Sequence, residues 1–518
     1  MSGDARVLPR VLMLGLDAAD HDVVQRLIGA GRLPNLAGLA ARGTSARLHS
    51  PAGLYAGGVW PTFYTGQPVA RHGVFHNKQW RPAAMRVEVP TTEWTSAVPF
   101  WERWQASDLE SLIIDVPMVL GRPRPLRGLY VGGWGTHDLI CRGSWPTGLW
   151  RELQQRFGAP IMPREEFGWP NDESLARLGV TLRRATEQLR DITSDLLARH
   201  SWRFACVVFG TLHRAGHYLW DRSQVEPGTP PAASADLPTP ALLALYDCLD
   251  EAVGRVLERV SADTLVIVFA VHGMGPNPGW SDLLPDILGR IEEHRSGRPP
   301  RRGWLYRMRQ TVPHHWQRWL LELLPASATG RLVRLWSRHM YDWSRTRSFP
   351  LPMDETGYLR INLRGREREG LVAPEREYDE ACAGLEALIA GLRDESSARP
   401  IARPAVRAWR DADPDAPCRD LVPDLIVPFG GPPAAATRRL VSTALPGFRY
   451  DVPSRLPSGR SGNHRDHGWL IAAGPRVAAG TTLADREVLD LLPTVRAALG
   501  LPPEPGLPGR PITEITGP

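Results

Sequence analysis

Two histidines four residues apart, His213 and His217, form the pattern in this sequence that is best suited to chemistry. On a helix that spacing places both rings on one face, where they can bind one metal ion together. The pair alone is weak evidence, because a chain with 15 histidines carries many on its surface or in its core. The evidence for a metal site becomes stronger with Asp17, His272 and His464, because each lies near glycine at the border of a strand-like run. Such ligands suit zinc, manganese or iron, and three histidines with a water form a known catalytic zinc arrangement.

Short apolar runs must position these groups. The runs cover residues 11–17, 204–209, 264–271 and 468–473. Continuous apolar runs of this length are typical of buried parallel strands, and ligands gather at the carboxyl edge of such sheets. Each run adjoins a candidate ligand, so four remote parts of the chain can supply one edge. Helix-like periodicity over residues 23–41 follows the first run. The layout predicts an α/β enzyme.

Six groups of short motifs stand in a fixed order along the chain. They are Leu14-Gly-Leu-Asp17, Thr65-Gly66 followed by Arg71-His72-Gly73-Val74, His272-Gly-Met-Gly275, Asp342 to Arg347, Gly357 to Arg366, and Gly462-Asn-His464. In this order they resemble type I phosphodiesterase and nucleotide pyrophosphatase proteins of the alkaline phosphatase superfamily. The resemblance extends from about residue 10 to about residue 515. It implies an α/β fold with a mostly parallel central sheet and helices on both faces. Substrates vary widely in that superfamily, so the motifs name none.

Proteins of that family hold two divalent metals, usually zinc, and the resemblance implies ligands at corresponding positions. Here the first site becomes His213, His217 and His464. His213 stands where an aspartate is usual. The first site is therefore complete but altered.

The second implied metal site has lost a ligand. It keeps Asp17 and His272, but Val271 stands where the family has an aspartate. Together with His213, this replacement removes two negative charges, so two adjacent cations would be poorly neutralised. We therefore expect one divalent transition metal rather than two, with zinc favoured and manganese or iron as alternatives.

The family's threonine or serine nucleophile is also missing. Counting back without gaps from Thr65-Gly66, its position falls on Ala56, which has no hydroxyl. The spacing has an internal check, because the family's phosphate-binding asparagine lies 21 residues beyond the nucleophile, and here that residue is Asn77, followed by Lys78. Ala56 is therefore a real replacement. Asn77 and Lys78 are expected to neutralise charge that develops on a substrate.

These departures favour a hydrolase of phosphate or related esters with an atypical site. Covalent catalysis through a threonine is excluded if Ala56 occupies the nucleophile position. The remaining nucleophile is a water whose pKa the metal lowers toward about 7. Two other functions stay open. One is a catalytically silent descendant that binds a ligand or a partner, and the other is a non-hydrolytic mononuclear metalloenzyme in a biosynthetic pathway.

The amino-acid composition limits the kinds of partner and the cellular location that we expect for this protein. The 518 residues carry a formal net charge of +6, almost wholly from arginine, since Lys78 is the only lysine. We do not take this charge as a sign of nucleic-acid binding, but a modest positive field favours a small anionic substrate. Five scattered cysteines without a C-x-x-C pair predict reduced thiols in the cytoplasm. The sequence contains no uninterrupted apolar segment of about 18 residues, which argues against a membrane span.

The sequence predicts a core in two parts, residues 10–278 and 344–515, around an inserted helical cap at 279–343. Arginines alternate there with tryptophans, and short apolar stretches suggest amphipathic helices. The tryptophans are Trp304, Trp316, Trp319, Trp336 and Trp343. We expect them to pack on the core, with contact to a membrane surface or a partner as the alternative. The oligomeric state is not indicated.

Several singled-out residues also have structural interpretations. Asp17 could cap the helix that follows it, and His272 could be structural. His467 is a rival ligand to His464, although the family pattern favours His464. His72 is interpreted as structural, because the family has no ligand at its position. Asp20 and His21 could approach the metal edge, but a solvated helix start is the preferred interpretation of both.

Overall fold

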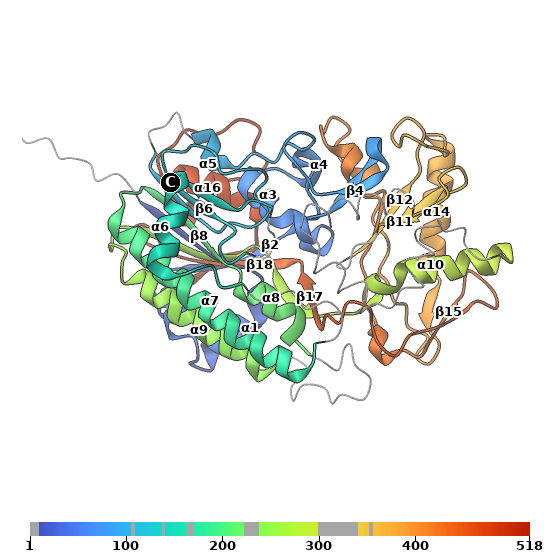
Figure 1. The fold of residues 1–518 in the computed structure, drawn as a ribbon, viewed down its shortest axis with the longest axis horizontal. Helices are drawn as coiled ribbons and strands as arrows, with labels where there is room; N and C mark the ends of the chain where they lie inside the picture. Colours follow the sequence, from blue (N-terminus) through green and yellow to red (C-terminus); the bar gives the residue numbers. More distant parts are fainter. Residues whose placement is uncertain are drawn as a thin grey trace, which may run out of the picture.

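The molecule has two lobes, a large central sheet with helices and a smaller lobe built from short strands and helices (Figure 1). The computed structural model describes residues 10–104, 109–136, 140–162, 170–221, 238–298, 340–351 and 356–517.

The large lobe is organised by a ten-stranded sheet in the order β19-β2-β18-β9-β1-β8-β5-β6-β7, with β20 also paired to β2. Its strands are β1 (Val11–Leu16), β2 (Thr44–His49), β5 (Ser111–Ile114), β6 (Gly128–Gly132), β7 (Gly143–Trp145), β8 (Phe204–Phe209), β9 (Leu265–Ala270), β18 (His467–Ala473), β19 (Thr481–Thr482) and β20 (Arg486–Glu487). The five central strands β6, β5, β8, β1 and β9 are all parallel. The predicted mostly parallel sheet is confirmed.

One strand of this sheet runs against its central neighbour. β18 pairs antiparallel with β9, and Trp469 lies opposite Ala270. The chain therefore enters β18 at the edge where β9 ends. This direction matters for the site, because it brings residues before β18 to the carboxyl edge of the parallel strands.

Both faces of the sheet are covered by helices, as predicted. Successive side chains of a strand point to opposite faces, and β1 contributes to both cores: Leu12 and Leu14 to one, Val11 and Met13 to the other. The first core is covered by α1 (His21–Gly29), α2 (Pro34–Ala41), α6 (Thr147–Phe157), α7 (Asp172–Arg199), α8 (Thr211–Leu219) and α9 (Pro240–Leu257). The second is covered by α3 (Val59–Thr65), α5 (Phe100–Arg103), α16 (Leu491–Ala498) and α17 (Thr513–Thr516). Figure 1 shows the two layers below and above the sheet.

The helical segment predicted over residues 23–41 is two helices, α1 (His21–Gly29) and α2 (Pro34–Ala41). Gly31 adopts a positive φ of 72° between them, and proline is favoured where a helix restarts at its first turn. The cap of α1 is Asp20, whose side chain accepts the backbone N–H groups of Asp22 and Val23. Asp20 is buried, so its interpretation as a solvated helix start was wrong.

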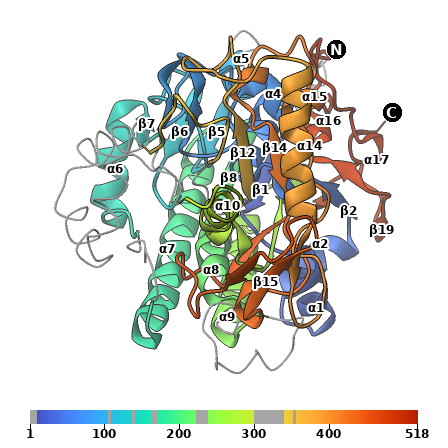
Figure 2. The same cartoon turned by 90° about the vertical axis from the view of Figure 1, so that its right-hand side faces the viewer.

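The smaller lobe contains two three-stranded antiparallel sheets. One joins β11 (Ser348–Pro350), β12 (Gly357–Ile361) and β14 (Leu425–Val427), and the other joins β13 (Leu392–Asp394), β15 (Arg439–Ser442) and β16 (Arg449–Asp451). The helices α10 (Trp280–Ser296), α14 (Arg376–Ala390) and α15 (Ala408–Asp411) belong to the same lobe. Figure 2 shows α14 beside β12 and β14. A two-stranded ribbon of β10 (Gly273–Pro276) and β17 (Gly462–Arg465) lies where the chain leaves and re-enters the large lobe.

The strand pairing divides the chain differently from the predicted domain boundaries. Within the segment 344–515, expected to be core, the strands up to Asp451 pair only with one another, and the chain rejoins the central sheet at β18. The helical cap expected at 279–343 begins with α10, which packs on β13, β15 and β16. The predicted cap helices and four of its five tryptophans fall at 299–339, outside the described residues; Trp343 is buried against Trp80 and Phe349.

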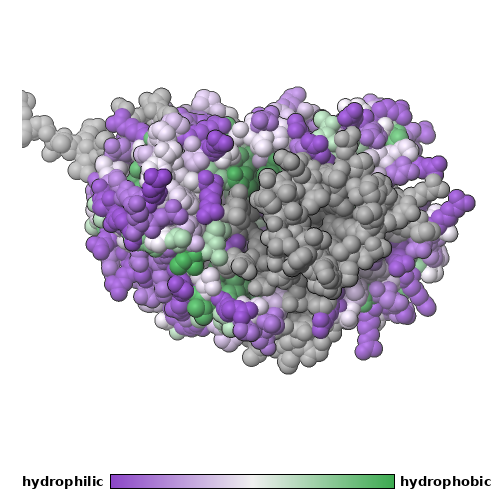
Figure 3. All heavy atoms as spheres, viewed as in Figure 1, coloured by the Kyte–Doolittle hydropathy of each residue, from purple (hydrophilic) through white to green (hydrophobic). Residues whose placement is uncertain are grey.

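The surface of the described part carries few large hydrophobic side chains. Val89 and Val180 are the exposed ones among the described residues, and Figure 3 shows mainly hydrophilic side chains on the visible face outside the grey atoms. Within the described ranges, no helix combines the length and apolar character needed to cross a membrane.

A buried ion network ties the smaller lobe together. Arg360 donates to Glu367 at 2.7 Å, and Arg366 donates to Asp424 at 2.7 Å and to Glu367 at 2.9 Å. Burial alone would raise the pKa of Asp424, but the charges of Arg366 and Arg360 and the hydrogen bonds from Arg366 and the Ile361 N–H together lower it. Both arginines therefore act as structural groups, because their donors are used inside the lobe.

Asp424→Ala is expected to lower the free energy of unfolding by about 3–5 kcal/mol, because Arg366 would keep only Glu367 as a partner for its buried charge. Denaturant unfolding measures this change. The control is Asp413→Ala, whose exposed pair with Arg71 should contribute less than about 1 kcal/mol. Equal effects of the two substitutions would contradict a structural role for the network.

Candidate metal centre

The five predicted ligands come together at the edge where the parallel strands end. Asp17 directly follows β1, and His272 follows the end of β9 by two residues. His213 and His217 lie on α8, which begins just after β8. His464 lies on β17, directly before the antiparallel β18. Their candidate ligand atoms form two overlapping groups, each within 4.8 Å.

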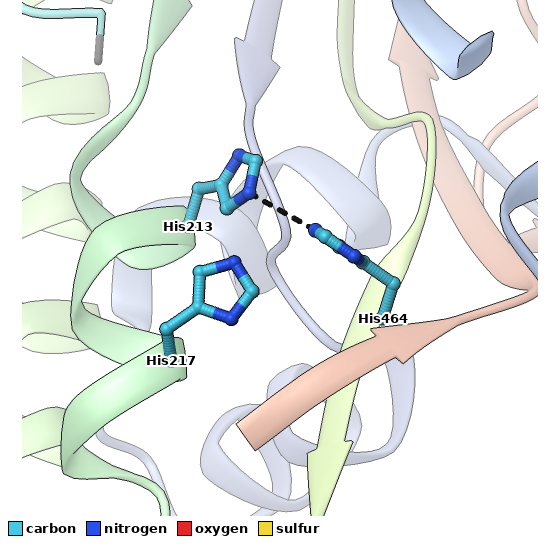
Figure 4. A group of neighbouring side chains, drawn as sticks. All are labelled: His213, His217 and His464. Carbon is cyan, nitrogen blue, oxygen red and sulfur yellow. Dashed lines mark hydrogen bonds between the residues drawn. The ribbon is translucent and has the colours of Figure 1, made fainter. Parts of the chain in front are cut away.

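Three histidines form the first group. His213 and His217 share one face of α8, and His464 faces them from β17 (Figure 4). The Nε2 atoms of His213 and His464 are 3.0 Å apart. The ring centroid of His217 lies 5.1 Å from that of His213 and 5.0 Å from that of His464. The group thus surrounds a common point, as a three-histidine metal site requires.

The second group consists of Asp17, His213 and His272. Asp17 Oδ2 lies 2.8 Å from His213 Nδ1, and Asp17 Oδ1 lies 3.3 Å from His272 Nε2. All three residues are buried. His213 belongs to both groups, because its Nδ1 faces Asp17 while its Nε2 faces His464.

Hydrogen bonds assign the protons of two rings. An ionised carboxylate can only accept, so His213 Nδ1 donates to Asp17, and its Nε2 keeps a lone pair. His217 Nδ1 lies 3.0 Å from the carbonyl oxygen of Gly462, so it also donates and leaves Nε2 with a lone pair. At 3.0 Å from His213 Nε2, the Nε2 atom of His464 must either carry a proton or share a cation with it. Rings held in this way are typical of metal ligands, so the donor set fits a divalent ion.

The electrostatics favour the ligand forms of these groups. Burial alone would raise the pKa of Asp17, but His213 and His272 more than offset this and hold it well below its usual value. Burial, followed by the neighbouring histidines, lowers the pKa of His464 well below its usual value. Asp17 is therefore ionised and His464 neutral near pH 7, and neutral imidazole is the form that binds metals.

The position of the missing nucleophile lies beside the predicted phosphate-binding residues. Ala56 is buried and begins the short 3-10 helix η2 (Ala56–Gly58), which leads into α3. A Cβ atom at Gly57 would lie 2.7 Å from the Cα atom of His76, so η2 packs directly against the residue before Asn77. This contact supports the predicted spacing. Asn77 is partly exposed and Lys78 is exposed, and their part in catalysis stays a prediction.

Trp60 also contacts the site, and it was not among the residues predicted from the sequence. Its indole Nε1 donates to Asp17 Oδ1 at 2.8 Å, and the residue is buried. Trp60 lies four residues after Ala56, so the two share one side of a helical turn. That spacing is the only signal in the sequence that could have pointed to it.

Two other histidines have structural roles or lie outside the cluster. His72, interpreted as structural, is buried; its Nε2 lies 3.1 Å from Thr62 Oγ1, and its Nδ1 accepts the backbone N–H of Val74 at 3.1 Å. Burial lowers the pKa of His72 to about 3. The rival ligand His467 lies opposite His49 on β2, with ring centroids 5.5 Å apart, and belongs to neither ligand group.

The pKa of His72 predicts a loss of stability in acid. Between pH 6.5 and about 3, the unfolded chain binds a proton on this ring and the folded chain does not. The free energy of unfolding should therefore fall as the pH falls, and His72 should contribute about 1.4 kcal/mol per pH unit to this decrease. Above pH 6.5, the contribution of His72 should no longer change with pH. His72→Gln should reduce that slope by about one proton in unfolding measurements across this range. Identical slopes for both proteins would contradict the prediction.

The comparisons with known proteins agree with the motifs. The family model described as type I phosphodiesterase/nucleotide pyrophosphatase matches residues 11–428, and the chain belongs to this family. It is thus a member of a family of phosphodiesterase- and pyrophosphatase-like hydrolases.

Solved structures with a similar course of the chain include human ectonucleotide pyrophosphatase/phosphodiesterase 5, with 12% identity, 98% of both chains covered and a TM-score of 0.49. Phosphonoacetate hydrolase from Sinorhizobium meliloti, in complex with phosphonoformate, has 14% identity and a TM-score of 0.45, with 92% of this chain and 91% of that chain covered. Among curated protein sequences, none matched.

Proposed function

We propose that this chain is a metal-dependent hydrolase of small anionic phosphate or related esters, with one divalent transition metal bound at the histidine cluster. Zinc is the expected ion, and manganese or iron are alternatives. The observation that carries the proposal is the three-histidine group, in which hydrogen bonds at Nδ1 orient the rings of His213 and His217. Asp17 and His272 adjoin this group and complete the predicted set of five residues.

The chemistry depends on the ion and on a few groups of the chain. A divalent ion bound there would supply the chemistry that Ala56 cannot provide, because it would lower the pKa of a water toward about 7. His213 and His217 would hold the ion from α8, and His464 would hold it from β17. Asn77 and Lys78 neutralise negative charge on the substrate.

The proposal of a single ion rests on the lost charges. His213 and Val271 stand where the family has aspartates, so Asp17 is the one carboxylate left in either ligand group. A second cation near the first would lack the anionic ligands that normally offset repulsion.

The five buried thiols, all unpaired, are consistent with our expectation of a cytoplasmic protein.

Metal removal and return test the proposal. The chelated protein should not hydrolyse bis(para-nitrophenyl) phosphate or para-nitrophenyl phosphate, and about one equivalent of zinc should restore activity toward at least one of them. If the metal-loaded protein hydrolyses neither ester, nor any of a panel of phosphonates and sulfate esters, the proposal that the protein is a hydrolase is contradicted.

A second candidate is a catalytically silent descendant that binds a ligand or partner, and Ala56 together with Val271 favours it. It predicts binding of an anion such as inorganic phosphate without turnover of any ester. A non-hydrolytic mononuclear enzyme, the third possibility, predicts instead bound iron and a reaction that depends on the oxidation state of that iron.

A further inference from the structure

We infer that Asp17 acts on the metal through His213, as the acceptor that sets the proton of that ring, and that it is not itself a metal ligand. This inference rests on the proposed function and revises one predicted ligand. The family position of Asp17 implies a ligand of a second ion, whereas the contacts of Asp17 in this chain point to a positioning residue.

Both oxygens of Asp17 already accept hydrogen bonds from the chain. Oδ2 accepts from His213 Nδ1 at 2.8 Å, and Oδ1 accepts from Trp60 Nε1 at 2.8 Å. The carboxylate is buried, with a side-chain exposure of 1%. His272 Nε2 also lies 3.3 Å from Oδ1, so a metal ion at either oxygen would compete with side chains that are themselves buried.

The packing of the Trp60 ring holds its indole N–H at Asp17 Oδ1. Its ring packs on Phe63 at 5.7 Å and on Phe269 at 6.0 Å between centroids. The ring also needs the space left by Gly15, since a Cβ atom there would lie 2.9 Å from Trp60 Cη2. The indole N–H is thus fixed at Oδ1 by packing on β1, β9 and its own helix. The indole N–H therefore competes with a second ion for this oxygen.

The same contacts make His213 a better ligand. With its Nδ1–H given to a buried carboxylate, the ring keeps its Nε2 lone pair directed toward His464 and becomes more electron-rich. The negative charge of Asp17 also offsets part of the charge of an ion bound by three neutral histidines. Replacing the family's aspartate by His213 thus changes the task of Asp17 from binding an ion to orienting a ligand.

The test is a titration of metal-free protein with Co²⁺, followed by its visible absorption and by elemental analysis. Wild type should bind about one equivalent. Asp17→Asn should still bind one equivalent, with an affinity about 10–100-fold weaker and a shifted cobalt band, because the His213 ring loses its anionic acceptor. The matched control is Asp20→Asn, the same change in another buried carboxylate at this edge, whose oxygens contact α1 and Arg465. It should change the affinity less than about threefold, so a general loss of packing would not mimic the result.

Two outcomes overturn the inference in different ways. If wild type binds two equivalents and Asp17→Asn binds one, Asp17 is a ligand of a second ion, while the proposed metal-dependent function survives. If wild type binds no Co²⁺ or Zn²⁺, the proposed function fails and this inference fails with it. The wild-type stoichiometry decides between these cases even if Asp17→Asn does not fold.

Discussion

His464→Ala is expected to remove the tightly bound metal and to lower ester hydrolysis at least about 1000-fold, because two histidines on one helix cannot hold a catalytic ion in place. His464 is the only member of the three-histidine group that comes from outside α8. Its loss opens the site on the side of β17, so excess zinc should restore little activity. Elemental analysis of the purified variant, together with its turnover number, measures both effects.

The matched control for this variant is His467→Ala. His467 lies three residues further along the chain, is partly exposed and faces His49 rather than the cluster. Metal content and turnover should stay within about twofold of wild type. If His464→Ala keeps its metal and its activity, the assignment of the site is wrong.

Hydrolysis is expected to invert the configuration at phosphorus. A single displacement by water inverts the centre, whereas attack by a protein hydroxyl followed by water gives net retention. Because Ala56 offers no hydroxyl, wild type should take the single-displacement route. A chiral phosphorothioate ester hydrolysed in labelled water, with the product analysed by phosphorus NMR, measures the outcome.

Ala56→Thr provides the companion experiment. If the gap-free count from Thr65-Gly66 is right, a threonine here would stand at the family's nucleophile position, on the element that packs against the residue before Asn77. A large gain in phosphodiesterase activity with retained configuration would establish that assignment. Net retention by wild type, in contrast, would require a nucleophile from the chain and would contradict direct attack by water.

The sequence predicted the central sheet well because its inner strands are fully buried. The apolar runs at 11–17, 204–209, 264–271 and 468–473 correspond closely to β1, β8, β9 and β18. A strand covered on both faces must be apolar throughout, so it stands out in a sequence. The short strands β11 to β16 could not be found in this way, because most are three or four residues long and pair with distant segments.

The types of the site residues were also predictable, but their hydrogen bonds were not. His213 and His217 were visible from helical spacing, and Asp17 from its place after a strand. The bond from His213 Nδ1 to Asp17 joins residues 196 positions apart, so no local pattern encodes it. No local pattern encodes the hydrogen bond from Trp60 to Asp17 either, because it depends on the packing of the Trp60 ring against β1. The sequence therefore predicted the residues of the candidate metal centre without showing how their side chains are oriented.

A crystal structure with anomalous scattering recorded at the zinc edge tests the central claim most directly. We predict one strong anomalous peak, at about 2.0–2.1 Å from a ring nitrogen of each of His213, His217 and His464. Asp17 should remain hydrogen-bonded to His213 beside it. A metal-saturated crystal with no peak among these three rings would contradict the account.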